Sequence, residues 1–395
     1  MTNLSFVLKK YLPESAQDSS VAIADDVLID GIKKHHASSH GRRLTSYTPG
    51  ESFSLGNLRA SFVYKRDSLS LEVEESQLPL WGVNDYSGEK KCFLTNSGQA
   101  SLFAGLTYCR SILNVTSIAR LSPVYIGARE GAEVLGMKFE QPGDAKVLWL
   151  CSSSFFKELI IYLRKFISGI EVVLIDTTCW SLDSSLLQEL MEMCADKTII
   201  LMRSISKLDM AGIEYGSLGS LVLLTHDDVE EKSAQLDKIL KITGGAPSLD
   251  DIPPYLFDQD YHRFLSSRNI EMEKITGSIQ EMAKTWTYPE LVTTFFPEHK
   301  KYFFIYLHSH EFGDGKEILN LLSRTFQIYE IPVKAIASFG FEETVISAFK
   351  ENDSDVGILR ISPGRGFDRD HAIHKAVAYF FELLTHYRMK FNERE

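Results

Sequence analysis

Residues 172–224 read VVLIDTTCWSLDSSLLQELMEMCADKTIILMRSISKLDMAGIEYGSLGSLVLL, and this stretch decides the fold. Two short apolar runs, Val172–Ile175 and Thr198–Met202, stand on either side of a segment with helical spacing. Runs that are apolar throughout and joined by a helix are typical of parallel strands buried on both faces. The stretch therefore predicts the order strand, helix, strand, with one more strand at its end.

Two reactive side chains follow these predicted strands. Asp176 comes directly after the first run, and Lys207 ends the segment RSISK, residues 203–207, after the second. Ligands of such sheets bind beyond the carboxyl ends of the strands, so we expect an acid and an amine to face one crevice. This pairing suits pyridoxal phosphate, which takes a lysine as its Schiff base partner and a carboxylate against its pyridine nitrogen.

The composition is that of an ordinary globular protein. The chain has 395 residues, 44% of them hydrophobic and 24% charged, which allows two domains and an extension. A net charge of −11 argues against broad binding to nucleic acid or to an anionic membrane. No apolar run approaches the roughly 20 residues of a membrane span, and the five cysteines form no close pair at metal-ligand spacing. We expect a reduced, cytoplasmic protein without a metal centre.

A second motif lies upstream. Cys92–Leu94 reads as a strand, Asn96-Ser97-Gly98 as a turn, and Gln99–Leu113 as an amphipathic helix. This order places backbone N–H groups at the positive end of a helix, where an anion is well bound. Together with Lys207, the turn is a candidate phosphate cradle.

The remaining pattern alternates between strands and helices and divides the chain into three parts. Further strands are expected at Val124–Ile126, Lys146–Cys151, Ile328–Val333, Thr344–Phe349 and Val356–Ser362, and further helices at Glu130–Met137, Phe155–Phe166, Asp228–Ile242, Tyr261–Trp286, Lys316–Thr325 and Asp370–Tyr387. The segment LDDIPPY after residue 248 marks a domain boundary. We expect an N-terminal arm over 1–60, a large cofactor-binding domain over 61–248 and a small domain over 249–395.

The segment at 204–207, Ser-Ile-Ser-Lys, resembles the S-[LMV]-[ST]-K motif of fold-type I pyridoxal-phosphate enzymes, and Asp176-Thr177-Thr178 resembles their D-N-T. The details are most similar to the Cys/Met-metabolism group of cystathionine γ-synthase, cystathionine γ-lyase and methionine γ-lyase. The resemblance implies an α/β fold with a mostly parallel seven-stranded sheet in the large domain and a smaller C-terminal α/β domain. It also implies roles in binding the cofactor: the Schiff base for Lys207, phosphate contacts for Ser204 and Ser206, and the pyridine nitrogen for Asp176, with Thr178 beside it.

Four further segments carry the resemblance. Ser97-Gly98-Gln99-Ala100 is similar to S-G-M-A, which implies that Ser97, Gly98 and Gln99 bind the phosphate. Tyr125-Ile126-Gly127-Ala128 is similar to Y-G-G-T, which implies that Tyr125 stacks on the cofactor ring. Tyr64-Lys65-Arg66 resembles Y-[ST]-R, which implies that Tyr64 and Arg66 reach a neighbouring subunit in a homodimer or homotetramer. The segment from Ile358 to Ser362 resembles L-[IV]-R-[LI]-S, in which Arg360 grips a substrate carboxylate.

The reaction stays open at this point. The family's G-H-x-D after the lysine reads Ala211-Gly212-Ile213-Glu214 here, and its P-x-N-P stretch is absent. The motifs favour elimination or replacement at the side chain of an amino-acid substrate, with Lys207 moving protons and Tyr125 as a candidate acid. An aminotransferase, a decarboxylase and a cofactor-free scaffold remain as alternatives.

Three of these residues also have ordinary structural explanations. Asp176 is placed to cap a helix that begins near Leu182, and Tyr125 suits a core position. Arg360 has acidic residues close to it in sequence, at Asp353 and Asp355, with which it can pair.

Overall fold

The structure is a computed structural model, and it forms two compact units, residues 1–267 and 268–395. The boundary between the units falls within helix α10 (Gln259–Ala283). The three-part division at 60 and 248 stays a prediction. The described residues are 4–12, 28, 31–35, 52–55, 58–61, 74–75, 83, 86–121, 124–143, 145–151, 159–179, 185–211, 216–247, 252–283, 293–295, 305–309, 315–336, 343–350, 357–364 and 372–392.

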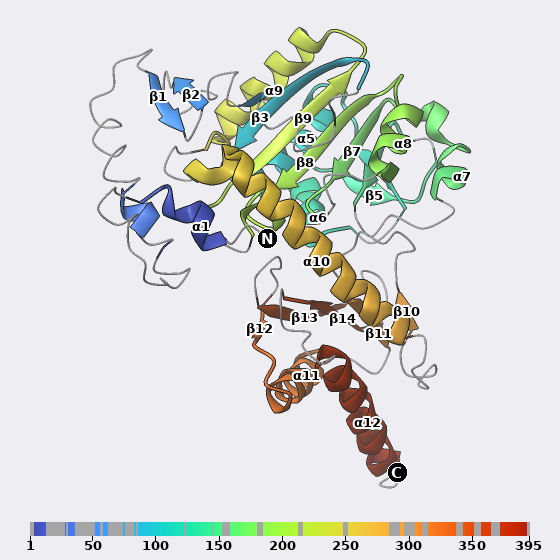
Figure 1. Cartoon of the computed structure of the whole chain (residues 1–395). Helices are drawn as coiled ribbons and strands as arrows, with labels where there is room; N and C mark the ends of the chain where they lie inside the picture. Colours follow the sequence, from blue (N-terminus) through green and yellow to red (C-terminus); the bar gives the residue numbers. More distant parts are fainter. Residues whose placement is uncertain are drawn as a thin grey trace. The chain divides into compact units, whose positions relative to one another are not determined.

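A seven-stranded sheet in the order β3-β9-β8-β7-β6-β4-β5 forms the centre of the first unit (Figure 1). Its strands are β3 (Glu89–Thr95), β4 (Ser117–Arg120), β5 (Lys138–Glu140), β6 (Val147–Leu150), β7 (Val172–Asp176), β8 (Thr198–Ser204) and β9 (Gly219–Thr225). The five strands from β8 to β5 run parallel, whereas β9 is antiparallel to both β8 and β3. The prediction of a mostly parallel, seven-stranded sheet is confirmed.

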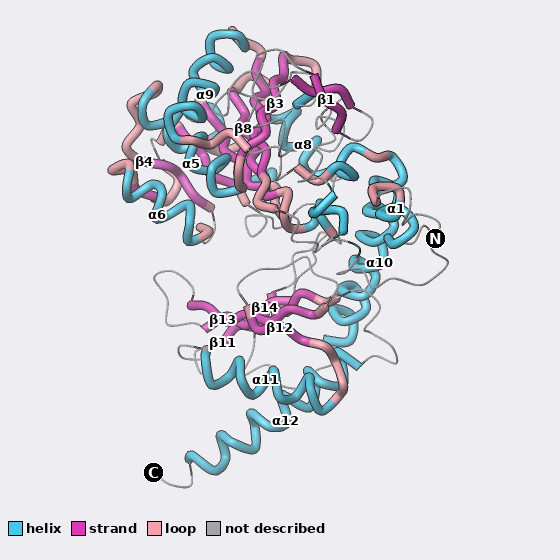
Figure 2. The backbone as a smooth tube through the Cα atoms, turned by 90° about the vertical axis from the view of Figure 1, so that its left-hand side faces the viewer, coloured by secondary structure: helices cyan, strands magenta, loops and turns pink. Residues whose placement is uncertain are grey.

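Alternation of side chains along the strands sends every second residue to each face of the sheet. One face packs against α5 (Gly98–Ser111), α6 (Ile126–Val134) and α9 (Val229–Thr243), where Trp149 and Leu174 are fully buried. Helix α8 (Ser185–Met193) lies on the other side of the sheet (Figure 2). With helices on both faces, the central strands are apolar throughout, which is why the sequence predicted β7 and β8.

The N-terminal helix α1 (Leu4–Lys9) packs into a hydrophobic cluster that also holds the segment after β8. Val7 and Leu8 are fully buried there, together with Ile205 and Met210, which lie before and after Lys207. The start of α10 completes the cluster with Tyr261, which is also fully buried. Helix α1 therefore belongs to the same core as the residues that flank Lys207.

The second unit is a five-stranded sheet in the order β10-β11-β14-β13-β12, with α11 (Lys316–Ile328) and α12 (Ala372–Asn392) packed on it (Figure 2). Its strands are β10 (Thr293–Phe295), β11 (Ile305–Ser309), β12 (Val333–Ala335), β13 (Thr344–Lys350) and β14 (Gly357–Ser362). Only β12 and β13 pair in parallel. The smaller C-terminal α/β part is thus confirmed.

The remaining described elements are short. They are a hairpin of β1 (Ser52–Leu55) and β2 (Leu58–Ser61), the helix α7 (Leu159–Leu163), and the 3-10 turns Ile167–Gly169, Leu208–Met210 and Pro254–Phe257. All five cysteines are free thiols. Among the described residues, no helix combines the length and apolar character that a bilayer crossing requires.

Two expected strands are wrong. The run Val124–Ile126 is not a strand; α6 begins at Ile126, and β4 lies earlier, at Ser117–Arg120. Ile126 is 54% exposed, so its apolar character does not report burial. The segment Ile328–Val333 is likewise not a strand, because α11 continues to an exposed Ile328 and β12 begins only at Val333.

Candidate cofactor site

Asp176 is the last residue of β7. It lies at the same edge of the sheet as the end of β8, where the lysine segment, residues 203–207, begins. It lies opposite Met202 in the β7–β8 register, and the N–H of Thr177 donates to the carbonyl oxygen of Met202 at 2.8 Å. The N–H of Thr178 donates to Oδ1 of Asp176 at 3.0 Å. This local hydrogen bond fixes the carboxylate at the carboxyl end of its strand, as the sequence predicted.

The lysine segment leaves β8 at Ser204 and turns sharply. The N–H groups of Ile205 and Ser206 both donate to the carbonyl oxygen of Leu218, at 3.0 and 3.3 Å. The hydroxyl oxygens of Ser204 and Ser206 lie 3.1 Å apart. Lys207 follows directly, is partly buried, and precedes the 3-10 turn Leu208–Met210. The two hydroxyls and the amine are therefore carried by one ordered turn.

Helix α5 begins directly on this turn. Ser97 is its N-cap, and its Oγ accepts from the N–H of Ala100 at 3.1 Å. A β-carbon added to Gly98 would lie 2.5 Å from Cβ and 2.8 Å from Cα of Ser204, and one added to Gly219 would lie 2.6 Å from the nitrogen of Gly98. Neither position has room for a side chain, which shows how closely the positive end of α5 approaches the end of β8.

A second helix start joins the first through Gln99. The Nε2 of Gln99 donates to the carbonyl oxygen of Gly127 at 2.9 Å. A β-carbon on Gly127 would lie 2.7 Å from Cε1 of Tyr125, so the tyrosine ring lies against the same glycine. Tyr125 is 54% exposed, which contradicts the interpretation of Tyr125 as a core aromatic.

Thr178 connects the acid to the lysine segment. Its Oγ1 accepts from the N–H of Ser204 at 3.0 Å, while its own N–H bonds Asp176. A continuous set of contacts therefore joins the segments that carry nine of the predicted residues. These are Ser97, Gly98, Gln99, Tyr125, Asp176, Thr178, Ser204, Ser206 and Lys207.

Burial raises the pKa of Asp176 above its ordinary value, although the hydrogen bonds from Thr178 and the positive charge of Arg203 oppose the rise. Desolvation of a carboxylate favours its neutral form unless a cation compensates. A cationic group bound next to Asp176 would therefore oppose the rise in pKa and favour the charged carboxylate.

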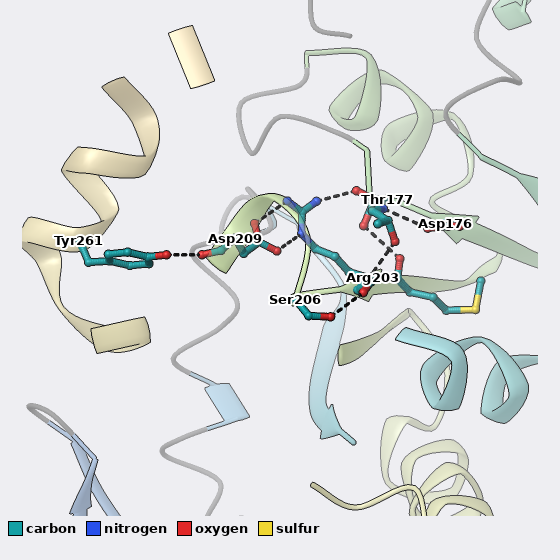
Figure 3. Close-up of polar contacts among 9 residues, drawn as sticks. Asp176, Thr177, Arg203, Ser206, Asp209 and Tyr261 are labelled. Atoms are coloured by element: carbon teal, nitrogen blue, oxygen red, sulfur yellow. Dashed lines mark hydrogen bonds and ion pairs between the residues drawn. The ribbon is translucent and has the colours of Figure 1, made fainter. Parts of the chain in front are cut away.

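The sequence interpretation missed a buried ion pair at this site, Arg203 with Asp209. The Nε of Arg203 donates to Oδ2 of Asp209 at 2.6 Å and an NH2 nitrogen donates to Oδ1 at 2.6 Å, with the side chains only 5% and 9% exposed. The NH1 nitrogen donates to the carbonyl oxygen of Thr177 at 2.6 Å, and the hydroxyl of Tyr261 donates to the carbonyl oxygen of Asp209 at 2.9 Å. Figure 3 shows these residues in a row from α10 to the end of β7. The signal in the sequence is Arg203 directly after the apolar run Ile199–Met202, because a buried arginine must be paired.

Three predicted residues are not part of this set of contacts. Arg360 lies on β14 in the second unit, where its Nε donates to Oγ of Ser347 at 3.1 Å. Its role toward a substrate carboxylate stays a prediction. Tyr64 and Arg66 lie outside the described residues.

Several solved structures have the same fold as this chain. A cystathionine γ-synthase from Xanthomonas oryzae pv. oryzae in complex with cystathionine aligns over 86% of this chain and 92% of its own, with 16% identity and a TM-score of 0.59. A cystathionine γ-lyase from Lactobacillus plantarum complexed with L-serine aligns over 86% and 93%, with 14% identity and a TM-score of 0.59. An aromatic amino acid aminotransferase from Burkholderia cenocepacia aligns over 88% and 87%, with 11% identity and a TM-score of 0.54.

These structures confirm the predicted fold, since γ-synthase and γ-lyase belong to the group whose motifs the sequence resembles. No family model and no curated protein matches the sequence. At such low identity the likeness establishes the fold, and the function has to be argued from the site.

Proposed function

We propose that this protein is a pyridoxal-phosphate-dependent enzyme that acts on an amino acid, with Lys207 binding the cofactor as a Schiff base. The observation that supports it most is the contact between the start of α5 and Ser204, three residues before Lys207. This contact places a helix N-terminus, two hydroxyls and a lysine around one point of the sheet edge. Asp176 lies on the adjacent strand, joined to Ser204 through Thr178.

The residues at the site fit the parts of the cofactor. The first N–H groups of a helix have no carbonyl partner within it, so those of Gly98 and Gln99 suit phosphate oxygens, together with the hydroxyls of Ser204 and Ser206. The carboxylate of Asp176 suits a protonated ring nitrogen. Tyr125, which is 54% exposed and lies against Gly127, suits stacking on the cofactor ring. The bound cofactor supplies an electron-withdrawing ring that stabilises negative charge at the substrate α-carbon.

The chain's own groups then carry out four tasks. The amine of Lys207, displaced by substrate, removes and returns a proton at the α-carbon. Asp176 holds the ring nitrogen protonated, and Arg360 binds the α-carboxylate in a bidentate manner. Tyr125 donates a proton to the departing group in an elimination or replacement at the substrate side chain. Tyr64 and Arg66 complete the phosphate site of a second copy, so a homodimer is the smallest active assembly.

An aminotransferase is the second candidate. It is supported by the structural likeness to an aromatic amino acid aminotransferase, which spans as much of this chain as the likeness to the γ-lyase. It would use the same groups around the cofactor, but the proton that Lys207 removes would not return to the α-carbon, and the amino acid would leave as a keto acid. The two reactions differ in whether the product keeps its side-chain substituent.

The test measures whether the protein binds pyridoxal phosphate and which lysine forms the covalent bond to it. The purified protein is mixed with pyridoxal phosphate, and the visible absorbance of the Schiff base is recorded before and after reduction with borohydride. Peptide mass spectrometry is expected to place the reduced adduct on Lys207, and Lys207→Arg is expected to lose both signals. Lys197→Arg is the matched control, because Lys197 is also poorly exposed but pairs with Asp196 before the start of β8. An adduct spread over several lysines, or no band at all, would refute the proposal.

The reaction is then identified from products. A panel of amino acids is incubated with the loaded protein, and mass spectrometry distinguishes side-chain loss from a keto acid or carbon dioxide. Release of the side-chain substituent is expected.

A further inference from the structure

We propose that Arg203 and Asp209 are positioning residues for Lys207, and that this buried pair holds the lysine turn against the segment that carries Asp176. The inference rests on the proposed function in that Lys207 is taken as the reactive amine. It extends that function to two residues outside the expected binding set.

The pair closes the lysine turn at its base. Arg203 precedes Ser204 at the end of β8, and Asp209 lies in the 3-10 turn that follows Lys207. Two hydrogen bonds of 2.6 Å join the guanidinium to both carboxylate oxygens. A planar, bidentate contact fixes orientation as well as distance, and a lysine in place of Arg203 could not reproduce it. The residues between them, 204–208, are therefore held as a closed loop.

The same guanidinium reaches the neighbouring segment. Its third hydrogen bond goes to the carbonyl oxygen of Thr177, directly between Asp176 and Thr178. On the other side, the carbonyl oxygen of Asp209 accepts from Tyr261 on α10 (Figure 3). Arg203 thus links the lysine turn to the acid segment, and Asp209 links it to a long helix.

Electrostatics agree with this role. Burial by itself lowers the pKa of Arg203, but the charge of Asp209 and its hydrogen bonds outweigh burial, so the net pKa is raised and the group stays cationic. The cation in turn opposes the rise in the pKa of Asp176 that burial causes. A buried ion pair is a weak source of stability compared with apolar packing. Positioning explains its presence better than stability does.

The test separates positioning from folding. The double variant Arg203→Met/Asp209→Leu removes both members of the ion pair together, whereas Arg203→Lys keeps the positive charge but not the bidentate contact. Lys232→Met is the control, because Lys232 bonds Thr198 at the opposite end of β8 and Thr225 at the end of β9. Melting temperature and circular dichroism establish which variants are folded.

Two readouts are then compared. In the cofactor-free protein, reductive methylation followed by peptide mass spectrometry gives the reactivity of Lys207 relative to the other lysines. In the presence of pyridoxal phosphate, the growth of the visible band gives the rate of cofactor attachment. We expect methylation of Lys207 alone to rise several-fold in both site variants, while attachment slows by roughly 100-fold, the loss typical of a small misplacement. Lys232→Met should change neither quantity.

The outcomes are distinguishable. If wild type does not bind pyridoxal phosphate, the proposed function fails, and the methylation comparison still tests whether the pair holds the lysine turn. If the folded variants show unchanged methylation at Lys207, the positioning role is wrong whatever the cofactor does. If the double variant does not fold, the decision rests on Arg203→Lys, which must show both effects.

Discussion

Gly98 and Ser204 touch so closely that a single added carbon on the glycine would overlap the serine, at 2.5 Å from its Cβ. The two residues come from strand–helix and strand–loop junctions that are more than a hundred positions apart in sequence. Their contact is what turns two separate motifs into one site.

Gly98→Ala tests this contact. The backbone of Ser204 lies 2.8 Å from the added carbon, so the helix or the turn has to shift. We expect a loss of about 1–3 kcal/mol in the free energy of unfolding, typical of overpacking, and at least a tenfold weaker affinity for pyridoxal phosphate. Urea denaturation and spectral titration measure the two quantities. Gly169→Ala, where the added carbon would meet no atom within 4 Å beyond its own stretch of backbone, is the control. Equal effects at both glycines would contradict the argument.

Thr178→Val tests the connection between the acid and the lysine turn. Valine keeps the shape but leaves the N–H of Ser204 without its acceptor, and an unsatisfied buried donor costs about 1–3 kcal/mol. The control is Thr107→Val, because the buried hydroxyl of Thr107 has no hydrogen-bond partner among the described residues. We expect this control to be neutral or stabilising in thermal denaturation. A smaller loss at 178 than at 107 would count against the connection.

The burial of Glu74 leads us to expect that the stability of the protein depends on pH. Only 3% of it is exposed, and burial raises its pKa to about 8, although the hydrogen bond from the N–H of Leu94 opposes the rise. Between its ordinary value and about 8, the folded protein binds the proton and the unfolded chain does not. The free energy of unfolding therefore falls as pH rises through this window, by up to about 1.4 kcal/mol per pH unit.

Glu74→Gln should remove this slope and stabilise the protein most at the alkaline end of the window, with little change near pH 4. Denaturant midpoints at a series of pH values give the measurement. Glu75→Gln is the control, since Glu75 is the exposed neighbour. A wild-type slope that persists in Glu74→Gln would show that another group is responsible.

Leu8→Ala tests whether α1 belongs to the core. Leu8 is fully buried in the cluster that holds Ile205 and Met210, so we expect a loss of about 2–5 kcal/mol in the free energy of unfolding. Phe6→Ala on the same helix, at a position 64% exposed, should change stability by about 0.5 kcal/mol or less. Chemical denaturation of both variants measures these losses. Equal losses in the free energy of unfolding would show that α1 is not part of the core.

Much of the fold was predictable because burial on both faces makes Val172–Ile175 of β7 and Ile199–Met202 of β8 continuous apolar runs. β4 was missed since only Ile118 and Ala119 are buried in it, between a serine and an arginine. The placement of the candidate residues at strand ends and helix starts was also predictable, since Asp176 ends β7 and Ser97 caps α5. The pairing of Arg203 with Asp209 did not, because it depends on how sharply the backbone turns after Ser204, which no spacing rule describes.

Strand β9 lies between β3 and β8 although it follows both in the chain. During translation, the edges meant for it remain open until residues 219–225 leave the ribosome, and open edges invite pairing with other chains. Synthesis that stalls before this point would yield nascent protein with Lys207 already made, yet with β3 not joined to the other five strands and with both open edges prone to aggregate.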